Sequence, residues 1–186
     1  MLPVIYSMSV SLDGFTAGPH DDISWTAPDT ELMRFHNEQT RQVAAHVCGR
    51  KLYETMLVWE TAEQTMTEAD DLEFARIWQP IPKVVFSRTL NAVRGNARLA
   101  TTDLANELNA LCNRSGDGVV AIDGAQLTAA AIAEDLIDEY RLFVCPVIIG
   151  SGISYFPPLP QSLELQLLES RTFSSRVVYL RYGRVR

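Results

Sequence analysis

The sequence has few of the residues that mark metal-binding, disulfide-rich or nucleic-acid-binding proteins. Its three cysteines, Cys48, Cys112 and Cys145, lie far apart and show no CxxC spacing. We therefore expect buried thiols in a reducing compartment and no metal site. Lysine and arginine number 16 against 23 aspartate and glutamate residues, which gives a net charge of −7. That balance argues against a nucleic-acid partner, because a surface that follows phosphates needs clustered cations.

Long apolar runs are absent as well. No stretch reaches membrane-spanning length, and the N-terminal sequence lacks the basic residues that open a signal peptide. We therefore expect a cytoplasmic protein without a membrane partner. With 186 residues, 47% hydrophobic and 21% charged, the chain is typical of one globular domain that spans residues 1–186.

The stretch from Gly118 to Gly152 indicates how the chain is organised. Val119–Ile122 is typical of a buried strand, Asp123-Gly124 interrupts it, an alanine-rich helix follows over Ala125–Glu134, and a second strand is expected over Tyr140–Ile149. A strand that leads into a helix through a small turn gathers unpaired N–H groups and the positive end of the helix dipole, which suits a phosphate. The same unit is common in α/β proteins, and the sequence contains neither GxGxxG nor GxxxxGK[ST]. A nucleotide site and an ordinary strand-turn-helix unit both remain open on these residues.

The remaining segments show alternating strand and helix patterns. The predicted elements are strands over Val4–Val10, Ala44–Cys48, Lys83–Phe86, Leu163–Leu167 and Val178–Tyr182, the last two joined near Ser174-Ser175; helices over Pro28–Gln42, Trp59–Gln79 and Asp103–Leu111; and a turn over Pro157–Pro160.

One loop has an unusual charge pattern. Gly49 ends a strand, and Arg50 and Lys51 then open a helix. Cations are unfavourable at the positive end of a helix dipole, and an anionic ligand would offset that cost. His46, on the preceding strand, fits a core position better than a catalytic one. Trp25 fits either a lid over the core or the wall of a pocket.

Six motifs, in this order, resemble those of the dihydrofolate reductase-like family that includes the reductase domain of riboflavin biosynthesis. They are SLDGFTAG, GRKLYE, KVVFSRTL, DGAQL, DEYRLFVCPVIIGSG and VVYLRY. The resemblance covers nearly the whole chain. It implies an α/β fold with a mostly parallel central sheet, antiparallel C-terminal strands and flanking helices.

The resemblance also implies a function. The expected activity is hydride transfer from NADPH to a small heterocyclic or carbonyl-type substrate, similar to a pterin or a deazaflavin precursor, by a homodimer. The rival is a non-enzymatic ligand-binding or scaffold protein that retains the reductase fold.

The resemblance assigns site residues in three groups. The implied catalytic residues are Asp13 and Glu31, although an acid at a helix start, such as Glu31, is also an ordinary dipole partner. The implied cofactor-binding residues are Ala17, Gly49, Arg50, Lys51, Leu52, Ser87, Arg88, Asp123, Gly124, Ala125, Gln126 and Leu127. The implied substrate-binding residues are Asp13, Trp25, Gly150, Ser151 and Gly152.

Two positions depart from the family pattern. Leu52 stands where a threonine is frequent, so one hydroxyl contact is missing. Asp123-Gly124 stands where the family usually has Gly-Gly, a pair that approaches the cofactor pyrophosphate through a strained, often cis, peptide. A carboxylate beside a diphosphate would add a repulsion of about 1–4 kcal/mol. Lost cofactor binding and an altered cofactor preference are the alternatives that this departure raises.

Overall fold

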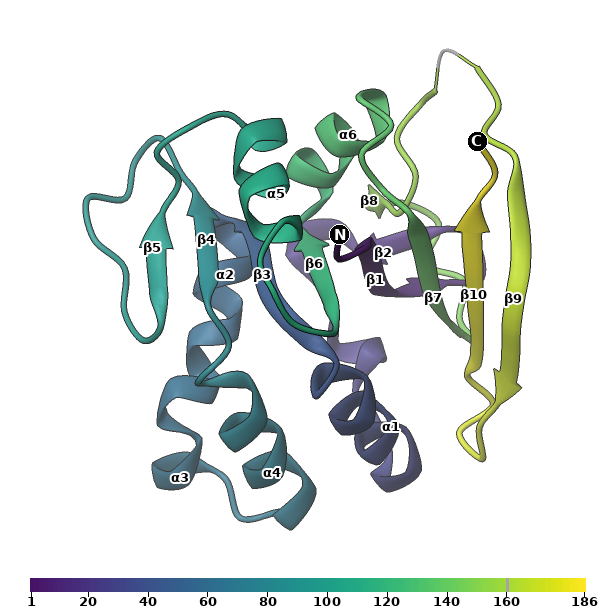
Figure 1. Ribbon diagram of the computed structural model, residues 1–186. Coiled ribbons are helices and arrows are strands. Elements are labelled where there is room, and N and C mark those ends of the chain that lie inside the picture. The colour runs from purple at the N-terminus through teal and green to yellow at the C-terminus, as the bar shows by residue number, and fades with distance from the viewer. Residues whose placement is uncertain (160) are drawn as a thin grey trace.

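The computed structural model describes residues 1–159 and 161–186, and a twisted β-sheet runs through its centre (Figure 1). Within the described residues this main sheet has eight strands, which are β1 (Val4–Ser11), β3 (Val43–Gly49), β4 (Lys83–Phe86), β5 (Ala97–Leu99), β6 (Val119–Asp123), β7 (Glu139–Cys145), β9 (Leu165–Thr172) and β10 (Val178–Arg184). Their order across the sheet is β5-β4-β3-β6-β1-β7-β10-β9. The short strands β2 (Phe15–Ala17) and β8 (Ile153–Ser154) pair with each other beside it.

The strands from β5 to β7 run parallel, whereas β10 runs antiparallel to both β7 and β9. The turn between β9 and β10 contains Ser174 and Ser175, where the alternating pattern predicted it. This mostly parallel sheet with antiparallel C-terminal strands confirms the fold class that the sequence predicted.

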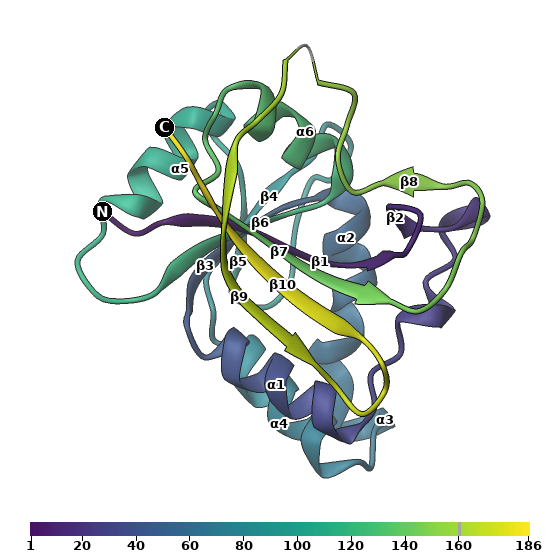
Figure 2. The same cartoon turned by 90° about the vertical axis from the view of Figure 1, so that its right-hand side faces the viewer.

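Helices cover both faces of the main sheet (Figures 1 and 2). The α-helices are α1 (Thr30–Thr40), α2 (Arg50–Met56), α3 (Ala62–Thr65), α4 (Ala69–Trp78), α5 (Leu104–Cys112) and α6 (Ala125–Ala133), and the 3-10 turns are η1 (Pro19–Asp21), η2 (Ser24–Thr26) and η3 (Leu57–Thr61). Helices α5 and α6 pack on one face, and α1, α2 and α4 lie over the other.

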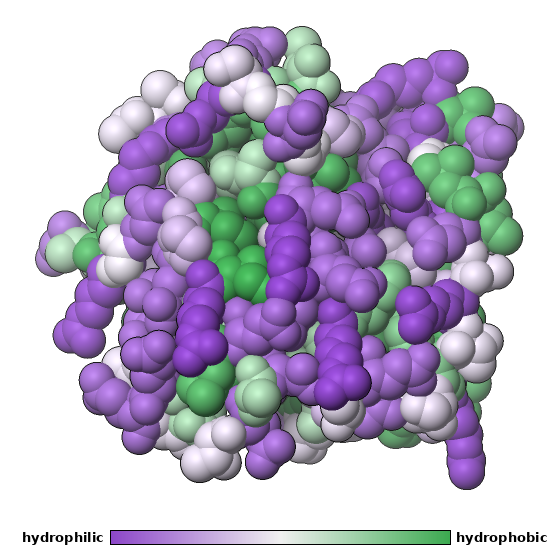
Figure 3. Space-filling model, turned by 60° about the horizontal axis from the view of Figure 1, so that its bottom comes forward, coloured by the Kyte–Doolittle hydropathy of each residue, from purple (hydrophilic) through white to green (hydrophobic). Residues whose placement is uncertain are grey.

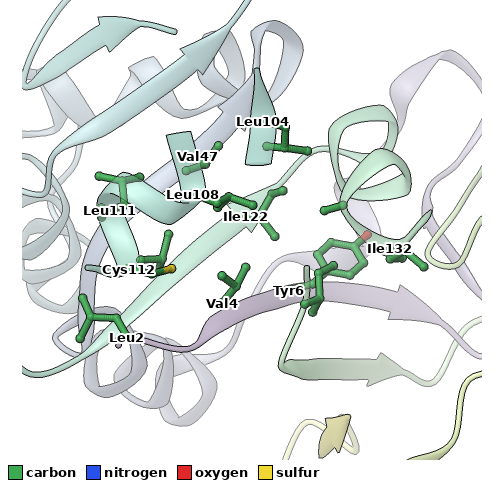
Figure 4. Packing of buried hydrophobic residues seen from close by; sticks show 14 of the residues in the cluster. Leu2, Val4, Tyr6, Val47, Leu104, Leu108, Leu111, Cys112, Ile122 and Ile132 are labelled. Carbon is green, nitrogen blue, oxygen red and sulfur yellow. The ribbon is translucent and has the colours of Figure 1, made fainter. Parts of the chain in front are cut away.

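The two faces bury different side chains of the same strands. On the α5 and α6 side, Val4, Tyr6 and Ile122 pack with Leu108 and Ile132 (Figure 4). Successive side chains of a strand point to opposite faces. The intervening residues of β1 and β6 therefore point toward α1, α2 and α4, where the candidate site lies.

Local chemistry explains where elements end. Asp29 begins α1, because its carboxylate accepts a hydrogen bond of 2.8 Å from the N–H of Leu32. Strand β7 stops at Cys145 rather than at the predicted Ile149, since Pro146 has no N–H to continue the ladder.

Two further predictions need correction or restriction. The single helix predicted over Trp59–Gln79 is divided into η3, α3 and α4. Thr61, with φ −119° and ψ 17°, separates η3 from α3, and Met66, with an extended backbone of φ −116° and ψ 148°, ends α3. Of the turn predicted over Pro157–Pro160, Pro160 lies outside the described residues. No helix among the described residues combines the length and the apolarity that crossing a membrane requires.

Candidate active site

A cavity of about 300 Å³ lies between the main sheet and the helices α1, α2 and α4. Leu52 and Met56 of α2 and Phe74 and Trp78 of α4 form much of its wall. On the side of the molecule that carries α1, α3 and α4, a patch of hydrophobic surface is framed by hydrophilic side chains (Figure 3). The cavity therefore combines the size and the largely apolar wall of a small-molecule site.

Polar side chains line the sheet side of this cavity in one row. Ser7 pairs with Arg141 across β1 and β7, and Cys48 pairs with Asp123 across β3 and β6. Tyr6 of β1 pairs with Ile122 of β6. The residues that follow them, Ser7 and Asp123, therefore lie side by side on these two strands. All four residues line the cavity. Adjacent strands are about 4.8 Å apart, so the backbones of Asp123 and Arg141 are separated by roughly 10 Å with Ser7 between them.

Asp123 forms a buried pair with His46. Its carboxylate Oδ2 lies 3.1 Å from the imidazole Nδ1, and Asp123 is only 8% exposed. The other ring nitrogen, Nε2 of His46, is buried and has no hydrogen-bond partner among the described residues. Burial raises the pKa of the Cys48 thiol to about 12, and the charge of Asp123 adds to that shift. The floor of the cavity therefore holds a carboxylate, an imidazole with one unused nitrogen, and a thiol that stays protonated.

Arg141 brings a positive charge to the same floor. Its guanidinium is 3% exposed and donates to Gln39 Oε1 at 2.7 Å and to Glu139 Oε2 at 3.1 Å. Arg181 also donates to both oxygens of Glu139, at 2.7 Å each. Burial raises the pKa of Glu139, but the hydrogen bond from Arg181 and the charge of Arg141 outweigh it and lower that pKa. Two cations share one carboxylate, so this end of the cavity favours a ligand oxygen that accepts hydrogen bonds.

His36 of α1 completes the polar lining as a neutral group. Its ring lies 4.5 Å from that of Phe143, and burial lowers the pKa of His36 to about 4. His36 is therefore uncharged at neutral pH.

The turns after β3 and β6 meet at the carboxyl ends of these strands. Gly124 has φ +98°, and a β-carbon there would lie 3.4 Å from the backbone nitrogen of Gly49. Gly124 is the N-cap of α6 and provides no side-chain cap, so the first N–H groups of that helix, from Ala125 to Leu127, have no intrahelical partner. The structure thus brings the predicted residues Gly49 and Gly124 together beside the cavity, and Leu52 lies on its wall.

Asp13 and the glycines near 150 are also brought together, outside the cavity lining. The Asp13 carboxylate accepts hydrogen bonds from the N–H groups of Ile149 at 3.2 Å and Gly150 at 2.7 Å. A hydrogen bond from Ser11, followed by those from Gly150 and Ile149, lowers the pKa of Asp13. A β-carbon at Gly152 would lie 2.0 Å from the carbonyl oxygen of Ala17. Asp13 therefore joins two loops, and Ser151 lies in the second of them.

Glu31 and Trp25 lie apart from the cavity lining. Glu31 accepts hydrogen bonds from Arg171 at 3.2 Å and from the N–H of Ser174 at 2.9 Å, so its carboxylate links α1 to the turn between β9 and β10. Trp25 packs against the apolar cluster around Phe35 and donates from Nε1 to the carbonyl of Asp22 at 3.2 Å. Of the two interpretations of Trp25, this placement corresponds to the lid over the core.

The predicted cations are paired or exposed. Arg50 donates to both oxygens of Glu54 at 3.3 Å, and Lys51 donates to Asp21 at 2.9 Å. Arg88 is exposed, and it follows a serine, Ser87, whose Oγ accepts from two backbone N–H groups of its own turn.

The expected conflict at Asp123 needs correction. The described residues contain no cis peptide bond. Asp123 still belongs to β6, and its side chain points to His46, whereas α6 packs on the opposite face. The carboxylate is therefore directed away from the turn where a diphosphate was expected.

Sequence reasoning missed His46, Ser7 and Arg141 as cavity residues. The signal was present in part, because Ser7, Ser9 and Ser11 alternate with apolar residues along β1. Such alternation inside a strand that is buried on both faces indicates a polar site on one of them.

Residues 3–179 match the family model of the RibD C-terminal domain. The chain belongs to this family. It is 30% identical over 182 residues to the uncharacterized protein YyaP of Bacillus subtilis (strain 168), and the match covers 96% of this chain and 93% of YyaP.

Solved structures show the same fold. A candidate riboflavin biosynthesis protein from Shewanella sp. PV-4 superposes with a TM-score of 0.75 at 23% identity, covering 100% of both chains. The diaminohydroxyphosphoribosylaminopyrimidine deaminase/5-amino-6-(5-phosphoribosylamino)uracil reductase of Thermotoga maritima gives 0.70 at 17% identity, covering 99% of this chain and 57% of that one.

Members of this family use a nicotinamide cofactor. The geometry of the two turns tests whether the residues of this chain fit such a cofactor. A pyrophosphate needs backbone N–H groups that no side chain covers. Gly124 provides no side-chain cap for α6, and a β-carbon at Gly49 would meet no atom within 4 Å. The residues at the two turns therefore fit the pyrophosphate of a nicotinamide dinucleotide.

Proposed function

We propose that this RibD-type domain is a reductase that transfers a hydride from NADPH to a carbonyl or imine carbon of a small heterocycle, such as a pyrimidine, a pterin or a deazaflavin precursor. The observation that carries the proposal is the cavity, whose floor places Asp123 and Arg141 in one row beside the glycine turns at Gly49 and Gly124.

The cofactor and the chain have separate tasks in this proposal. NADPH supplies the hydride when bound. Gly49, Arg50, Lys51 and the first N–H groups of α6 would hold it at the carboxyl ends of β3 and β6.

The cavity residues orient the heterocycle. Asp123 accepts a hydrogen bond from a ring N–H or amino group, and Arg141 donates to a carbonyl oxygen at the other end. A heterocycle with a donor at one end and an acceptor at the other matches this row. The apolar wall, including Leu52 and Trp78, excludes water from the reacting carbon.

The rival is a ligand-binding protein without reductase activity, and the ion pairs at the start of α2 bear on it. The cations at the start of α2 already have acidic partners, Glu54 for Arg50 and Asp21 for Lys51. These exposed pairs are worth about 0–1 kcal/mol each, so a 2′-phosphate can replace the carboxylates at little cost. Weak cofactor binding with retained binding of a heterocycle would favour the rival.

Titration of the pure protein with NADPH and with NADH, followed by tryptophan fluorescence, tests the proposal. Trp78 on the cavity wall provides the signal. We expect saturable NADPH binding at micromolar concentration and NADPH oxidation with a pyrimidine or pterin acceptor. Absence of binding at millimolar NADPH would contradict the reductase.

The cofactor preference gives a sharper prediction. A charge-assisted contact is worth about 1.5–3 kcal/mol, so Arg50→Ala should weaken NADPH binding at least tenfold and leave NADH binding nearly unchanged. Glu54→Gln is the matched variant: it frees the Arg50 guanidinium and should tighten NADPH binding only. Equal effects of either variant on the two cofactors would show that Arg50 does not contact the 2′-phosphate.

A further inference from the structure

We propose that His46 donates the proton in the reduction and that Asp123 is its positioning residue. This inference rests on the proposed reductase function and adds to it a catalytic acid from β3, a strand whose histidine the sequence patterns place in the core.

The geometry of the pair makes His46 a proton donor directed at the cavity. The side chains of His46 and Asp123 are 16% and 11% exposed, and they join through Nδ1 and Oδ2 at 3.1 Å. An ionised carboxylate only accepts hydrogen bonds, so the proton of this contact lies on Nδ1. The second nitrogen, Nε2, is then the atom that gains and releases a proton.

The unused Nε2 is the second observation. It is buried and lacks any partner among the described residues, although buried polar atoms are normally hydrogen-bonded. His46 also lines the cavity. A ligand heteroatom in the cavity would supply the missing partner.

The two cations that line the cavity, Lys83 and Arg141, have hydrogen-bond partners other than His46. Lys83 of β4 stands opposite His46 in the sheet register, and its Nζ donates to three backbone carbonyls, at 2.9, 3.2 and 2.9 Å. Arg141 of β7 is held by Gln39 and Glu139.

The remaining titratable groups around the cavity are poor donors at neutral pH. Burial raises the pKa of Cys48 to about 12 and lowers that of His36 to about 4, and the Tyr53 hydroxyl of α2 donates to the carbonyl of Arg94. Lys83 and Arg141 oppose a positive charge on His46, whereas Asp123 lies in contact with its ring and favours that charge.

The step balances with a dihydronicotinamide as the reductant. The acceptor carbon gains a hydride with its electron pair, and the π electrons of its C=N or C=O bond move to the heteroatom. The heteroatom takes the proton from Nε2 of the His46 imidazolium. The products are the reduced acceptor, the oxidised nicotinamide and a neutral His46, which regains a proton from solvent.

The first test needs no cofactor. The chain has three histidines, so ¹⁵N NMR of the imidazoles resolves His46 with His46→Gln as the assignment control. We expect the neutral ring to carry its proton on Nδ1, and Asp123→Ala to move it to Nε2. A wild-type ring with the proton on Nε2 alone would overturn the proposal.

The second test measures turnover, with 5-amino-6-(5-phosphoribosylamino)uracil and 7,8-dihydrobiopterin as acceptors. General acids typically contribute about 10²–10⁴-fold, so His46→Gln should lower kcat by that factor while the Kd of NADPH stays unchanged. Wild-type kcat should fall as pH rises, and the variant should show a flat profile. Asp123→Asn should lower kcat and leave the Kd of NADPH unchanged.

The matched control is the same substitution at the other cavity histidine. His36→Gln alters the wall without touching Asp123, so its kcat should keep the wild-type pH dependence. A His46→Gln enzyme with wild-type kcat and pH profile would overturn the role proposed for His46 and leave the proposed reductase function standing. A wild-type protein that neither binds nor oxidises NADPH would overturn the proposed function, and this inference with it.

Discussion

At the residue scale, the direction of the Asp123 side chain decides which face of the sheet its carboxylate lies on. Its neighbours Val120 and Ile122 point into the core beneath α5 and α6, and Asp123 points to the opposite face. The helix that starts after Gly124, α6, packs on the core side of the sheet. The Asp123 carboxylate therefore lies on the face opposite to the one that α6 covers.

This direction changes the expected effect of substitution on the cofactor. If the carboxylate faced a diphosphate, its removal would tighten NADPH binding. Because it faces His46, we expect Asp123→Asn to change the Kd of NADPH by less than about threefold, which corresponds to roughly 0.65 kcal/mol. Fluorescence titration of both proteins at one ionic strength measures this. A tenfold tighter variant would mean that the carboxylate does reach the phosphates.

Glu107 makes stability depend on acid pH. Its side chain is 3% exposed and pairs with Arg98, and the N–H of Thr101 donates to it at 2.8 Å. The hydrogen bond from Arg98, with those from the backbone, lowers the pKa of Glu107 from 4.5 to about 2 against the opposing effect of burial. A depressed pKa means that this stabilisation is complete above pH 4.5 and is lost as pH falls toward 2.

We therefore expect Glu107→Gln to lower the free energy of unfolding by about 1.5–3 kcal/mol at neutral pH. The difference from the wild type should shrink as the pH falls below about 4.5. Urea unfolding over a pH series measures it, and Glu73→Gln, which removes an exposed partner of Arg41, is the control. A difference that stays constant down to low pH would contradict the ion pair as its cause.

At the scale of elements, the C-terminus of α4 depends on one lysine from the next strand. Nζ of Lys83 donates to the carbonyls of Trp78, Gln79 and Ile81, and it lies 3.8 Å from the centroid of the Trp78 ring. Burial lowers the pKa of Lys83. A cation here satisfies carbonyls that the helix leaves unpaired.

Lys83→Met should therefore destabilise the protein by about 1.5–3 kcal/mol and change the fluorescence of Trp78. Lys51→Met is the matched control, because the exposed pair of Lys51 with Asp21 is worth about 0–1 kcal/mol. Thermal unfolding with tryptophan detection measures both. Equal stabilities of the two variants would show that the lysine contributes little to this end of α4.

The elements themselves were largely predictable. Strand β4 was predicted with both ends correct, and the predicted strand Ala44–Cys48 lies within β3. The strands β2, β5 and β8 were missed because segments of two or three residues show no periodicity.

The cavity floor was not predictable because it depends on strand order. Ser7, Asp123 and Arg141 belong to segments far apart in the sequence, and only the register across β6, β1 and β7 aligns them. Periodicity gives the face of a residue within one strand and does not give its neighbours in the sheet.

At the scale of the whole molecule, β9 is an exposed edge of the main sheet. It is eight residues long and most of its residues are exposed, including Leu167 and Leu168 at 51% and 48%. Long edge strands with apolar side chains pair readily with another chain.

We therefore expect a homodimer, as the family resemblance also implied. Light scattering at micromolar concentration should give twice the chain mass of 20.8 kDa. Leu167→Lys should shift the protein toward the monomer, and Leu12→Lys, an exposed apolar residue of the loop after β1, is the control. A wild-type monomer would rule the dimer out.

The position of β1 at the centre of the sheet affects how the chain folds during synthesis. Its two neighbours, β6 and β7, begin at Val119 and Glu139, so a ribosome has made most of the chain before either edge of the first strand can pair. Folding limited by such distant contacts is slow, on the millisecond to second scale for small domains rich in non-local pairings. Until then β1 has two free edges and depends on protection from aggregation. Pulse-labelled hydrogen exchange should show the amides of β1 gaining protection only together with those of β6 and β7.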